Sequence, residues 1–460
     1  MNREELIFAV RRFAHAPDAP GFNALAHGTH PSDLADVLRM LTPAQATSLL
    51  LLLDVPARAT LFAHFDAARQ DELLALLPHE SVLQLFEQMP ADDRADLFNR
   101  VQEPERRSLL AGLDVVERED ILSLAAYPEH AVGSATTSDF VAVDAGMTAA
   151  DALAHLRATA PGSETIYVLY VLDGDRLQGT VSLRDLVVAP PDAAIGGLLR
   201  RDPVFVRASW PRARAAELIR RYDLLAVPVV DDDERMIGIV TVDDAMDIDK
   251  EQDANQLARF GGTAVGGGGD LDVMNTPLRR MFGVRVFWLA VLTVFGIVTS
   301  TFVAAQEELL SQVIVLAAFI APIVDMGGNT GSQSATLVIR GMALGGLQST
   351  WRHVGFVIRR ELPIAAALGI TIALLEAVLA HFSKGVGVDV LLVVGLSMLV
   401  CTALGGVIGA LLPFAARRIG TDPATLSSPL ITSVMDLLGV LVYFGFAWLF
   451  LGDQLVSAAA

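Results

Sequence analysis

Long apolar stretches dominate the second half of the chain. Five of them after residue 280 are long enough for a membrane-spanning helix, which needs about 20 mostly apolar residues. We expect these helices near residues 282–304, 310–340, 362–381, 388–414 and 424–451. The second stretch is interrupted by glycines. The pattern predicts a helical membrane bundle of five helices.

The first 130 residues have a different pattern, with short amphipathic segments separated by prolines. Apolar residues such as Leu34, Val37, Leu38 and Leu41 recur at helical spacing. The punctuating prolines recur early at 12- and 13-residue intervals: Pro31, Pro43, Pro56, Pro78, Pro90 and Pro104. We predict an all-α superhelical domain over residues 1–130.

Residues 131–250 change again, to two similar βαβ-like units. The first ends in Gly179-Thr-Val-Ser-Leu-Arg-Asp185 and the second in Gly238-Ile-Val-Thr-Val-Asp-Asp244. Ser182 with Asp185, and Thr241 with Asp244, follow a strand in each unit, where they suit the phosphate and ribose of a nucleotide. Simple N-capping of the next helix is the alternative.

The charge is concentrated in the first part of the chain. The whole chain has 53 acidic and 34 basic residues and a net charge of −19, and from residue 271 onward ten acids balance ten bases. An acidic surface repels nucleic acid and attracts cations, although it also serves as an ordinary solvated face. The single cysteine, Cys401, excludes an intrachain disulfide.

Basic residues also predict the orientation in the membrane. They gather before the first predicted helix, between the second and third, and between the fourth and fifth: Arg279, Arg280, Arg285, Arg352, Arg359, Arg360, Arg417 and Arg418. The other loops contain only Lys384. By the positive-inside rule, and with no apolar signal segment in the first 30 residues, we expect a cytoplasmic N-terminus and an external C-terminus.

Polar groups inside the predicted membrane helices are candidate ion ligands. Asp436 lies deep in the last helix, and Thr432 and Gly439 share its face. A carboxyl kept protonated or hydrogen-bonded between helices is the alternative. The second helix contains the polar run Asp325-Met-Gly-Gly-Asn-Thr-Gly-Ser-Gln-Ser334, which predicts either a watery cavity or a packing face of small residues.

Acid pairs in the soluble part are candidate cation sites. Asp92 and Asp96 lie one helical turn apart, which is unfavourable unless a cation intervenes, or else they simply favour a helix N-terminus. A second acidic run, Asp244 to Asp253, includes Asp247 and Glu251 and precedes a glycine-rich linker at 266–269.

These motifs together resemble the MgtE family of Mg²⁺ channels over essentially the whole chain. Gly328-Asn329-Thr-Gly331-Ser-Gln333 is similar to the family signature of helix two, and Asp422-Pro-Ala through Ser427, Pro429, Asp436 and Gly439 is similar to that of helix five. The resemblance implies a multidomain membrane protein with an N domain (1–130), an α/β tandem CBS pair (131–250), a connecting plug helix (251–281) and a pore domain (282–460). It also implies a homodimer with the pore on its two-fold axis.

The resemblance assigns roles to individual residues. Asp436 resembles the pore carboxylate that holds hydrated Mg²⁺, and Asp422 the acid at the inner pore mouth, which contacts the plug helix through Mg²⁺. Asn329, Gln333, Asp325, Ser428 and Gly439 are expected to line the pore, and Ser428 stands where relatives often have Asn or Gly. Arg184 and Asp185 fit ATP binding by the CBS pair, whereas Leu224 replaces an aromatic that stacks on adenine in some relatives.

We therefore predict a Mg²⁺ channel of the inner cell membrane, with passive uptake gated by cytoplasmic Mg²⁺ and ATP as a candidate modulator. The gating ions would bridge acids from several domains, namely Asp92, Asp96, Asp223, Asp244, Asp247, Glu251, Asp253 and Asp422. A transporter for Co²⁺ or Ni²⁺ is the alternative within the class, and a membrane-anchored nucleotide sensor is the alternative from another class. An enzyme is not expected, because the chain has no nucleotide-hydrolysing motif and no catalytic constellation.

Overall fold

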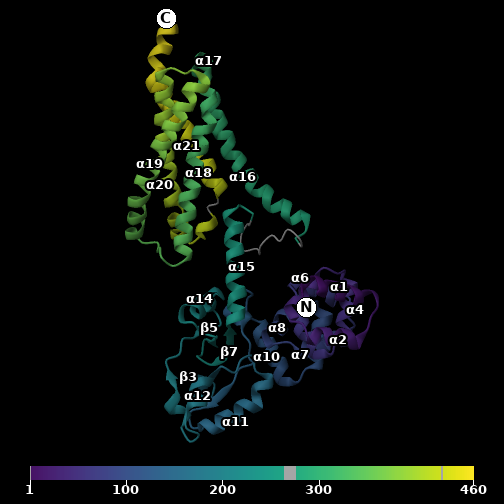
Figure 1. The fold of residues 1–460 in the computed structure, drawn as a ribbon. Coiled ribbons are helices and arrows are strands. Elements are labelled where there is room, and N and C mark those ends of the chain that lie inside the picture. Colours follow the sequence, from purple (N-terminus) through teal and green to yellow (C-terminus); the bar gives the residue numbers. More distant parts are fainter. Residues whose placement is uncertain (1, 264–275, 426–427, 460) are drawn as a thin grey trace. The chain divides into compact units, whose positions relative to one another are not determined.

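The chain divides into two compact units, Met1–Glu251 and Gln252–Ala460, seen in the computed structural model of Figure 1. The structure describes residues 2–263, 276–425 and 428–459. The linker predicted at 266–269 and Ser427 therefore lie outside the described residues. Each unit is described by itself below.

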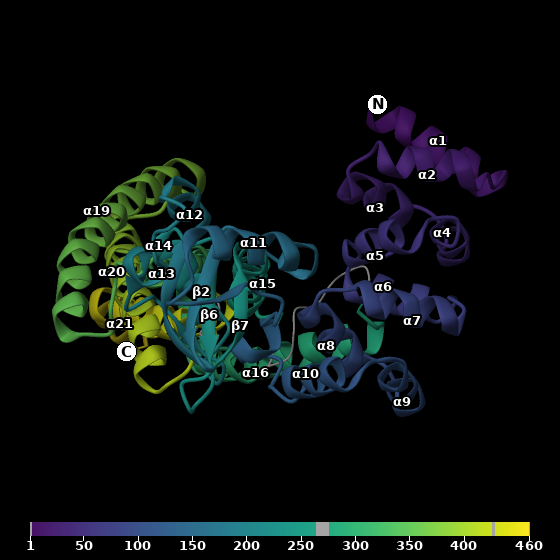
Figure 2. The same ribbon diagram turned by 90° about the horizontal axis from the view of Figure 1, so that it is seen from below.

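The first unit begins with a series of ten short helices that follow one another in chain order (Figure 2). Several helices contact the next but one, for example α3 and α5, α5 and α7, and α8 and α10, which agrees with the predicted superhelix. The helices are α1 (Arg3–His15), α2 (Ala19–His27), α3 (Pro31–Arg39), α4 (Pro43–Leu50), α5 (Val55–Ala63), α6 (Ala67–Leu74), α7 (His79–Gln88), α8 (Ala91–Arg100), α9 (Glu103–Gly112) and α10 (Val115–Ala125).

The prolines that punctuate this region mark helix starts. Pro31 and Pro43 open α3 and α4, and Pro78 and Pro90 are the residues before α7 and α8. Proline suits the first turn because its fixed φ is helical and the N–H that it lacks would have no partner there. The spacing of the prolines therefore explains why this region forms many short helices.

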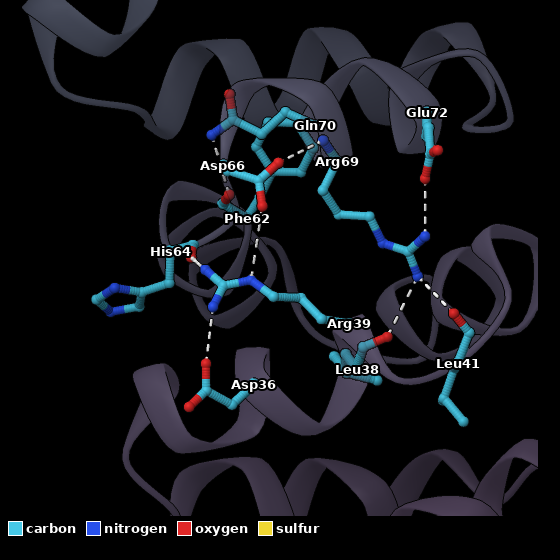
Figure 3. Close-up of polar contacts among 10 residues, drawn as sticks. All are labelled: Asp36, Leu38, Arg39, Leu41, Phe62, His64, Asp66, Arg69, Gln70 and Glu72. Carbon is cyan, nitrogen blue, oxygen red and sulfur yellow. Dashed lines mark hydrogen bonds and ion pairs between the residues drawn. The ribbon is translucent and has the colours of Figure 1, made fainter. Parts of the chain in front are cut away.

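Arginines connect different helices of this series by donating hydrogen bonds to carbonyls at helix ends. Arg69 on α6 reaches Leu38 O at 3.2 Å and Leu41 O at 2.8 Å, at the end of α3, and Arg39 reaches His64 O at 2.5 Å, just after α5 (Figure 3). Arg58 does the same for Leu50 and Leu53 after α4. The last carbonyls of a helix have no partner within it, so these guanidinium groups satisfy them.

The rest of the first unit is a pair of small α/β modules. Their sheets have the orders β1-β2-β3-β4 and β5-β6-β7, and in both the first strand is parallel and the third antiparallel to the second. The first module comprises η1 (Val132–Ala135), β1 (Ala142–Asp144), α11 (Ala149–Thr159), η2 (Ala160–Gly162), β2 (Val168–Asp173), β3 (Arg176–Ser182), α12 (Leu183–Val188), α13 (Ile195–Leu198) and β4 (Arg200–Arg201). The second comprises β5 (Val206–Arg207), α14 (Ala213–Tyr222), β6 (Ala226–Val230), β7 (Met236–Thr241) and α15 (Val242–Phe260). The predicted internal duplication is confirmed.

Among its described residues, the second unit contains five helices long and apolar enough to cross a membrane. Helices α18, α20 and α21 pack against one another, α19 packs on α20, and α16 packs on α21. The elements are α16 (Leu278–Ala304), α17 (Glu307–Gln312), η3 (Ile314–Leu316), α18 (Ala317–Ala343), α19 (Trp351–Lys384), α20 (Val388–Arg418), η4 (Pro423–Thr425) and α21 (Ser428–Ala459). The predicted fold class is confirmed in both units.

The helix ends differ from the expected ones in several places. The second predicted helix, 310–340, is broken near Val313, where φ is −127°, into α17, η3 and α18. The third begins at Trp351, so Arg352, Arg359 and Arg360 lie on α19 and not in a loop, and Arg417 and Arg418 lie in the last turn of α20. Apolar length marks the part inside the bilayer, whereas a helix continues into the headgroup region, where arginine is well hydrated.

Candidate functional site

An acidic hollow of about 480 Å³ lies in the first unit between α8 and the start of α15. Its basic residues are Arg100 and Arg212, against seven acids. Arg212 pairs with Glu251, and Arg100 pairs with Asp71 at 2.7 Å. The acids that line the hollow are Asp92, Asp93, Asp96, Glu129, Asp244, Asp247 and Glu251.

The carboxylates of the hollow repel one another. Burial, then the neighbouring Asp244, holds the pKa of Asp92 well above its usual range, and Asp92 Oδ1 is buried without a hydrogen-bond partner among the described residues. Burial first, and then Asp244, raises the pKa of Asp93 to about 6. Burial and Asp244 likewise raise the pKa of Glu164 to about 7. Such groups favour any process that removes or screens their charge, such as protonation or cation binding.

Five predicted metal candidates meet in this hollow: Asp92, Asp96, Asp244, Asp247 and Glu251. Asp223 does not line it, since it is the left-handed C-cap of α14 with φ 52°, and Asp253 belongs to the second unit. Across the residues that the structure describes, no group of three His, Cys, Asp or Glu side chains is placed to hold a metal ion on its own.

Asp93, Glu129 and Glu164 were missed by the sequence analysis. Asp93 is next to Asp92 in the first turn of α8, so its position on the helix could have suggested it. Glu129 and Glu164 lie in connecting segments, where no periodic pattern indicates which side chains will face the acids of α8 and α15. Only the tertiary fold brings these groups together.

The two nucleotide candidates have diverged in their contacts. The Ser182 hydroxyl accepts a bond from Asp185 N at 3.0 Å, and Asp185 pairs with Arg200 at 2.9 Å. The Thr241 hydroxyl donates to Asp244 Oδ2 at 2.6 Å. N-capping, the simpler alternative, is thus present at Ser182, while nucleotide binding by Ser182, Arg184, Asp185 and Thr241 stays a prediction.

Glycines in the second unit allow three membrane helices to approach closely. A Cβ on Gly405 would lie 2.2 Å from Gly327 O, and one on Gly409 would lie 2.0 Å from Gly331 O, so α18 and α20 meet backbone to backbone. On α21, Thr432 lies against Gly328 and Gly439 against Val324. The glycines of the α18 signature therefore serve packing.

The polar side chains of the same signature face away from these contacts. Asp325, Asn329 and Gln333, spaced by one helical turn, are exposed on α18, and Asn329 Nδ2 donates to Asp325 Oδ2 at 2.9 Å. A hollow of about 420 Å³ beside them is lined by further polar groups, including Ser332, Thr336 and Thr402. The packing face and the polar face of the signature thus coexist on opposite sides of one helix.

Asp436 is half-buried on α21 and interacts electrostatically with Asp325. Its carboxylate makes no hydrogen bond or ion pair within the described part of the chain, and its role as an ion ligand stays a prediction. Ser428, at the start of α21, donates to Ser332 Oγ at 2.8 Å.

Asp422 joins the loop after α20 to the end of α15. Its carboxylate accepts from Arg259 and, at 2.9 Å, from Ala424 N. Both Arg259 and Asp422 belong to the second unit. The acid expected at the pore mouth is therefore engaged by a cation of the protein itself.

Comparison with known protein families matches three parts of the chain. Residues 320–446 match a family described as a divalent cation transporter, MgtE, and residues 29–130 match the MgtE intracellular N domain. Residues 132–192 and 195–251 each match the CBS domain. The two α/β modules are thus a CBS pair.

Full-length relatives are also similar. The magnesium transporter MgtE of Thermus thermophilus is 33% identical over 97% of this chain and 99% of the relative, and that of Bacillus subtilis is 27% identical over 98% of each. Among solved structures, the cytosolic domain of the Mg²⁺ channel MgtE in complex with ATP covers 53% of this chain and 99% of its own, with 33% identity and a TM-score of 0.50. The soluble part of a magnesium transporter covers 55% and 99%, with 28% identity and a TM-score of 0.51.

Proposed function

The chain belongs to the MgtE family of magnesium transporters, and from that premise we propose that it is a Mg²⁺-selective channel for passive uptake, gated by cytoplasmic Mg²⁺. The observation that carries the proposal is the position of Asp436 close enough to Asp325, on the exposed polar face of α18, for the two carboxylates to interact electrostatically. Lipid satisfies neither a carboxylate nor a row of amides, so this face is expected to line a water-filled path.

A second copy of the chain would complete the path. If α18 and α21 of two subunits face each other across a two-fold axis, two Asp436 carboxylates meet on that axis. Mg²⁺ keeps several of its waters and binds one or two carboxylates, so the pair suits a hydrated ion, with Asn329 and Gln333 holding the waters. Carboxylate and amide oxygens are the hard ligands that suit Mg²⁺, whereas imidazole is the side chain that suits Ni²⁺.

Gating follows from the acidic hollow of the first unit. Each close pair of carboxylates costs about 1 to 4 kcal/mol, depending on the local dielectric, when no cation is present. Mg²⁺ binding at Asp92, Asp96, Asp244, Asp247 and Glu251 would stabilise the compact arrangement, and loss of Mg²⁺ would loosen it. Asp223, Asp253 and Asp422 are expected to bind further ions outside the hollow.

ATP and membrane orientation complete the proposal. The ATP complex of the related cytosolic domain makes ATP a candidate ligand of the CBS pair here. The arginines at the start of α19 and the end of α20 favour a cytoplasmic position for that end of the helices, which leaves the C-terminus external. We assign no catalytic activity.

Mg²⁺ flux into liposomes containing the purified full-length protein tests both parts. Asp436→Asn, which keeps the side-chain shape and removes its charge, is expected to lower flux at least tenfold. Glu376→Gln, which neutralises an acid on a different spanning helix, α19, is the matched control and should conduct normally. Asp92→Asn combined with Asp244→Asn should conduct but need more Mg²⁺ on the cytoplasmic side for inhibition.

Two results would count against the proposal. Normal flux through Asp436→Asn would exclude that residue from the permeation path. Absence of flux in the unmodified protein, together with ATP binding, would favour the nucleotide sensor instead. Competition by Co²⁺ and Ni²⁺ in the same assay measures the selectivity directly.

A further inference from the structure

A small hollow of about 220 Å³ lies where α19 begins and α20 ends, away from the polar face of α18. Val354 and Phe414 form its apolar wall as part of a hydrophobic cluster between α18, α19 and α20. Polar and aromatic groups form the rest. The lining includes Thr350, Trp351, Val354, Leu411, Phe414 and Arg418.

Arg418 is held in this hollow by stacking. Its guanidinium carbon lies 4.1 Å from the ring centroid of Trp351. Stacking uses the flat face of the guanidinium and leaves its in-plane N–H donors available, which is the geometry that recognises a phosphate. In the described ranges, Arg418 has no carboxylate or hydrogen-bond partner that would occupy these donors.

The surroundings are basic and typical of a membrane interface. Arg352 in the first turn of α19 and Arg417 beside Arg418 add positive charge, and no acid is among the described residues that line the hollow. Trp351 is 72% exposed, and amphipathic tryptophan rings gather at the level of the lipid headgroups. We therefore expect the hollow to lie at the depth of the lipid phosphates.

We propose that this hollow, which we call the Arg418 site, binds the headgroup of an anionic phospholipid. The phosphate would accept from the in-plane N–H groups of Arg418, and the first part of an acyl chain would lie over Val354 and Leu411. A free phosphate ion has no use for an apolar wall, which is why the geometry favours a lipid. Basic pockets between membrane helices are recognised lipid sites in general. The proposal requires only that α19 and α20 span the membrane and is independent of ion permeation and gating.

Tryptophan quenching by brominated lipid tests the Arg418 site on the full-length protein. The protein is reconstituted in phosphatidylcholine vesicles with a minor fraction of either brominated phosphatidylglycerol or brominated phosphatidylcholine, with bromine near the headgroup end of the chain. The signal of Trp351 is the difference between the unmodified protein and Trp351→Phe. We expect stronger quenching of Trp351 by the anionic lipid.

Arg418→Gln should lower the preference for phosphatidylglycerol about fivefold, which corresponds to the ~1 kcal/mol contributed by one basic residue at an anionic surface. Arg417→Gln removes the same charge from the next residue but not from the lining, and should keep most of the preference. Equal losses in the two variants would mean that general surface charge attracts the lipid, and would overturn the site.

Two further measurements separate the remaining explanations. Arg418→Lys keeps the charge but loses the stacked planar fork, so an intermediate preference is expected; it also replaces Arg418→Gln if that variant does not reconstitute. An unchanged preference in Arg418→Lys would exclude recognition by the stacked guanidinium. Displacement of the brominated lipid by millimolar inorganic phosphate would show that the site takes a free anion, and would overturn the assignment to lipid.

Discussion

Replacing Asp93 by Asn should stabilise the cytoplasmic unit when no divalent cation is present. Asp93 lines the acidic hollow, where burial, then Asp244 and Asp96, oppose its ionisation. An amide has nearly the same shape as the carboxylate but carries no charge to bury. The substitution therefore removes the free-energy cost of burying a negative charge beside other carboxylates, and it leaves the packing of α8 unchanged.

The magnitude follows from the pKa of Asp93, which rises from 3.8 to about 6 on folding. A rise of about two units corresponds to about 3 kcal/mol at ~1.4 kcal/mol per unit. Because the folded-state pKa is the higher one, the penalty is absent below pH 3.8, grows as the pH rises through the interval, and is complete above pH 6. Asp93→Asn should therefore gain up to about 3 kcal/mol at neutral pH and nothing at pH 3.5.

Urea unfolding of residues 1–251 at several pH values, in EDTA, measures this effect. These residues form one compact unit, and the corresponding cytosolic part of a relative was solved separately. Asp192→Asn, at an exposed acid outside the hollow, is the matched control and should change little. With saturating Mg²⁺, the gain from Asp93→Asn should shrink or reverse, since the variant loses a ligand or a counter-charge. A variant less stable than the unmodified unit in EDTA at pH 7.5 would refute the reasoning.

Two further predictions concern the second unit. Arg259→Gln removes the cation that pairs with Asp422, a partly exposed contact worth about 1 kcal/mol, and should raise flux at inhibitory Mg²⁺ about fivefold. Unchanged inhibition in Arg259→Gln would exclude the contact from gating. Gly409→Ala should lower the free energy of unfolding by about 1 to 3 kcal/mol, because its Cβ would lie 2.0 Å from Gly331 O. Gly395→Ala, with open space around its Cβ, is the control and should not change it. Equal thermal stability of the two variants in detergent would contradict the close α18–α20 contact.

The sequence was enough to predict the layers of the fold. Apolar length identified the spanning helices, proline spacing identified the short helices of the first domain, and the duplicated strand-aspartate motif identified the paired modules. Helix ends were predicted less well, because Trp351 starts α19 well before the apolar run begins. A helix end is set by caps such as Thr350, whose hydroxyl accepts from His353 N, and not by hydrophobicity.

The candidate site was predictable only in its local pairs. One turn of helix relates Asp92 to Asp96, and helical spacing also relates Asp244 to Asp247, so each pair is visible in the sequence. Their meeting in one hollow depends on how the first domain packs on the CBS pair, which no periodic pattern encodes. Glu164, in a connecting segment, does not line the hollow, but the tertiary fold brings its carboxyl near enough to Asp244 to interact electrostatically.

The two copies of the duplicated motif, Ser182 with Asp185 and Thr241 with Asp244, have the same sequence spacing but different surroundings. In both, a hydroxyl that ends a strand and an aspartate three residues later begin a helix. Asp185 forms an ion pair with Arg200. The Ser182 hydroxyl first, and then Arg200, lower the pKa of Asp185. Asp244 instead has Asp92 and Asp93 as neighbours, and burial first, then the nearby Asp243, raises its pKa despite the Thr241 hydroxyl. The same sequence motif therefore gives a carboxylate paired with arginine in the first module and a carboxylate surrounded by other acids in the second, and the second is the better candidate for binding a cation.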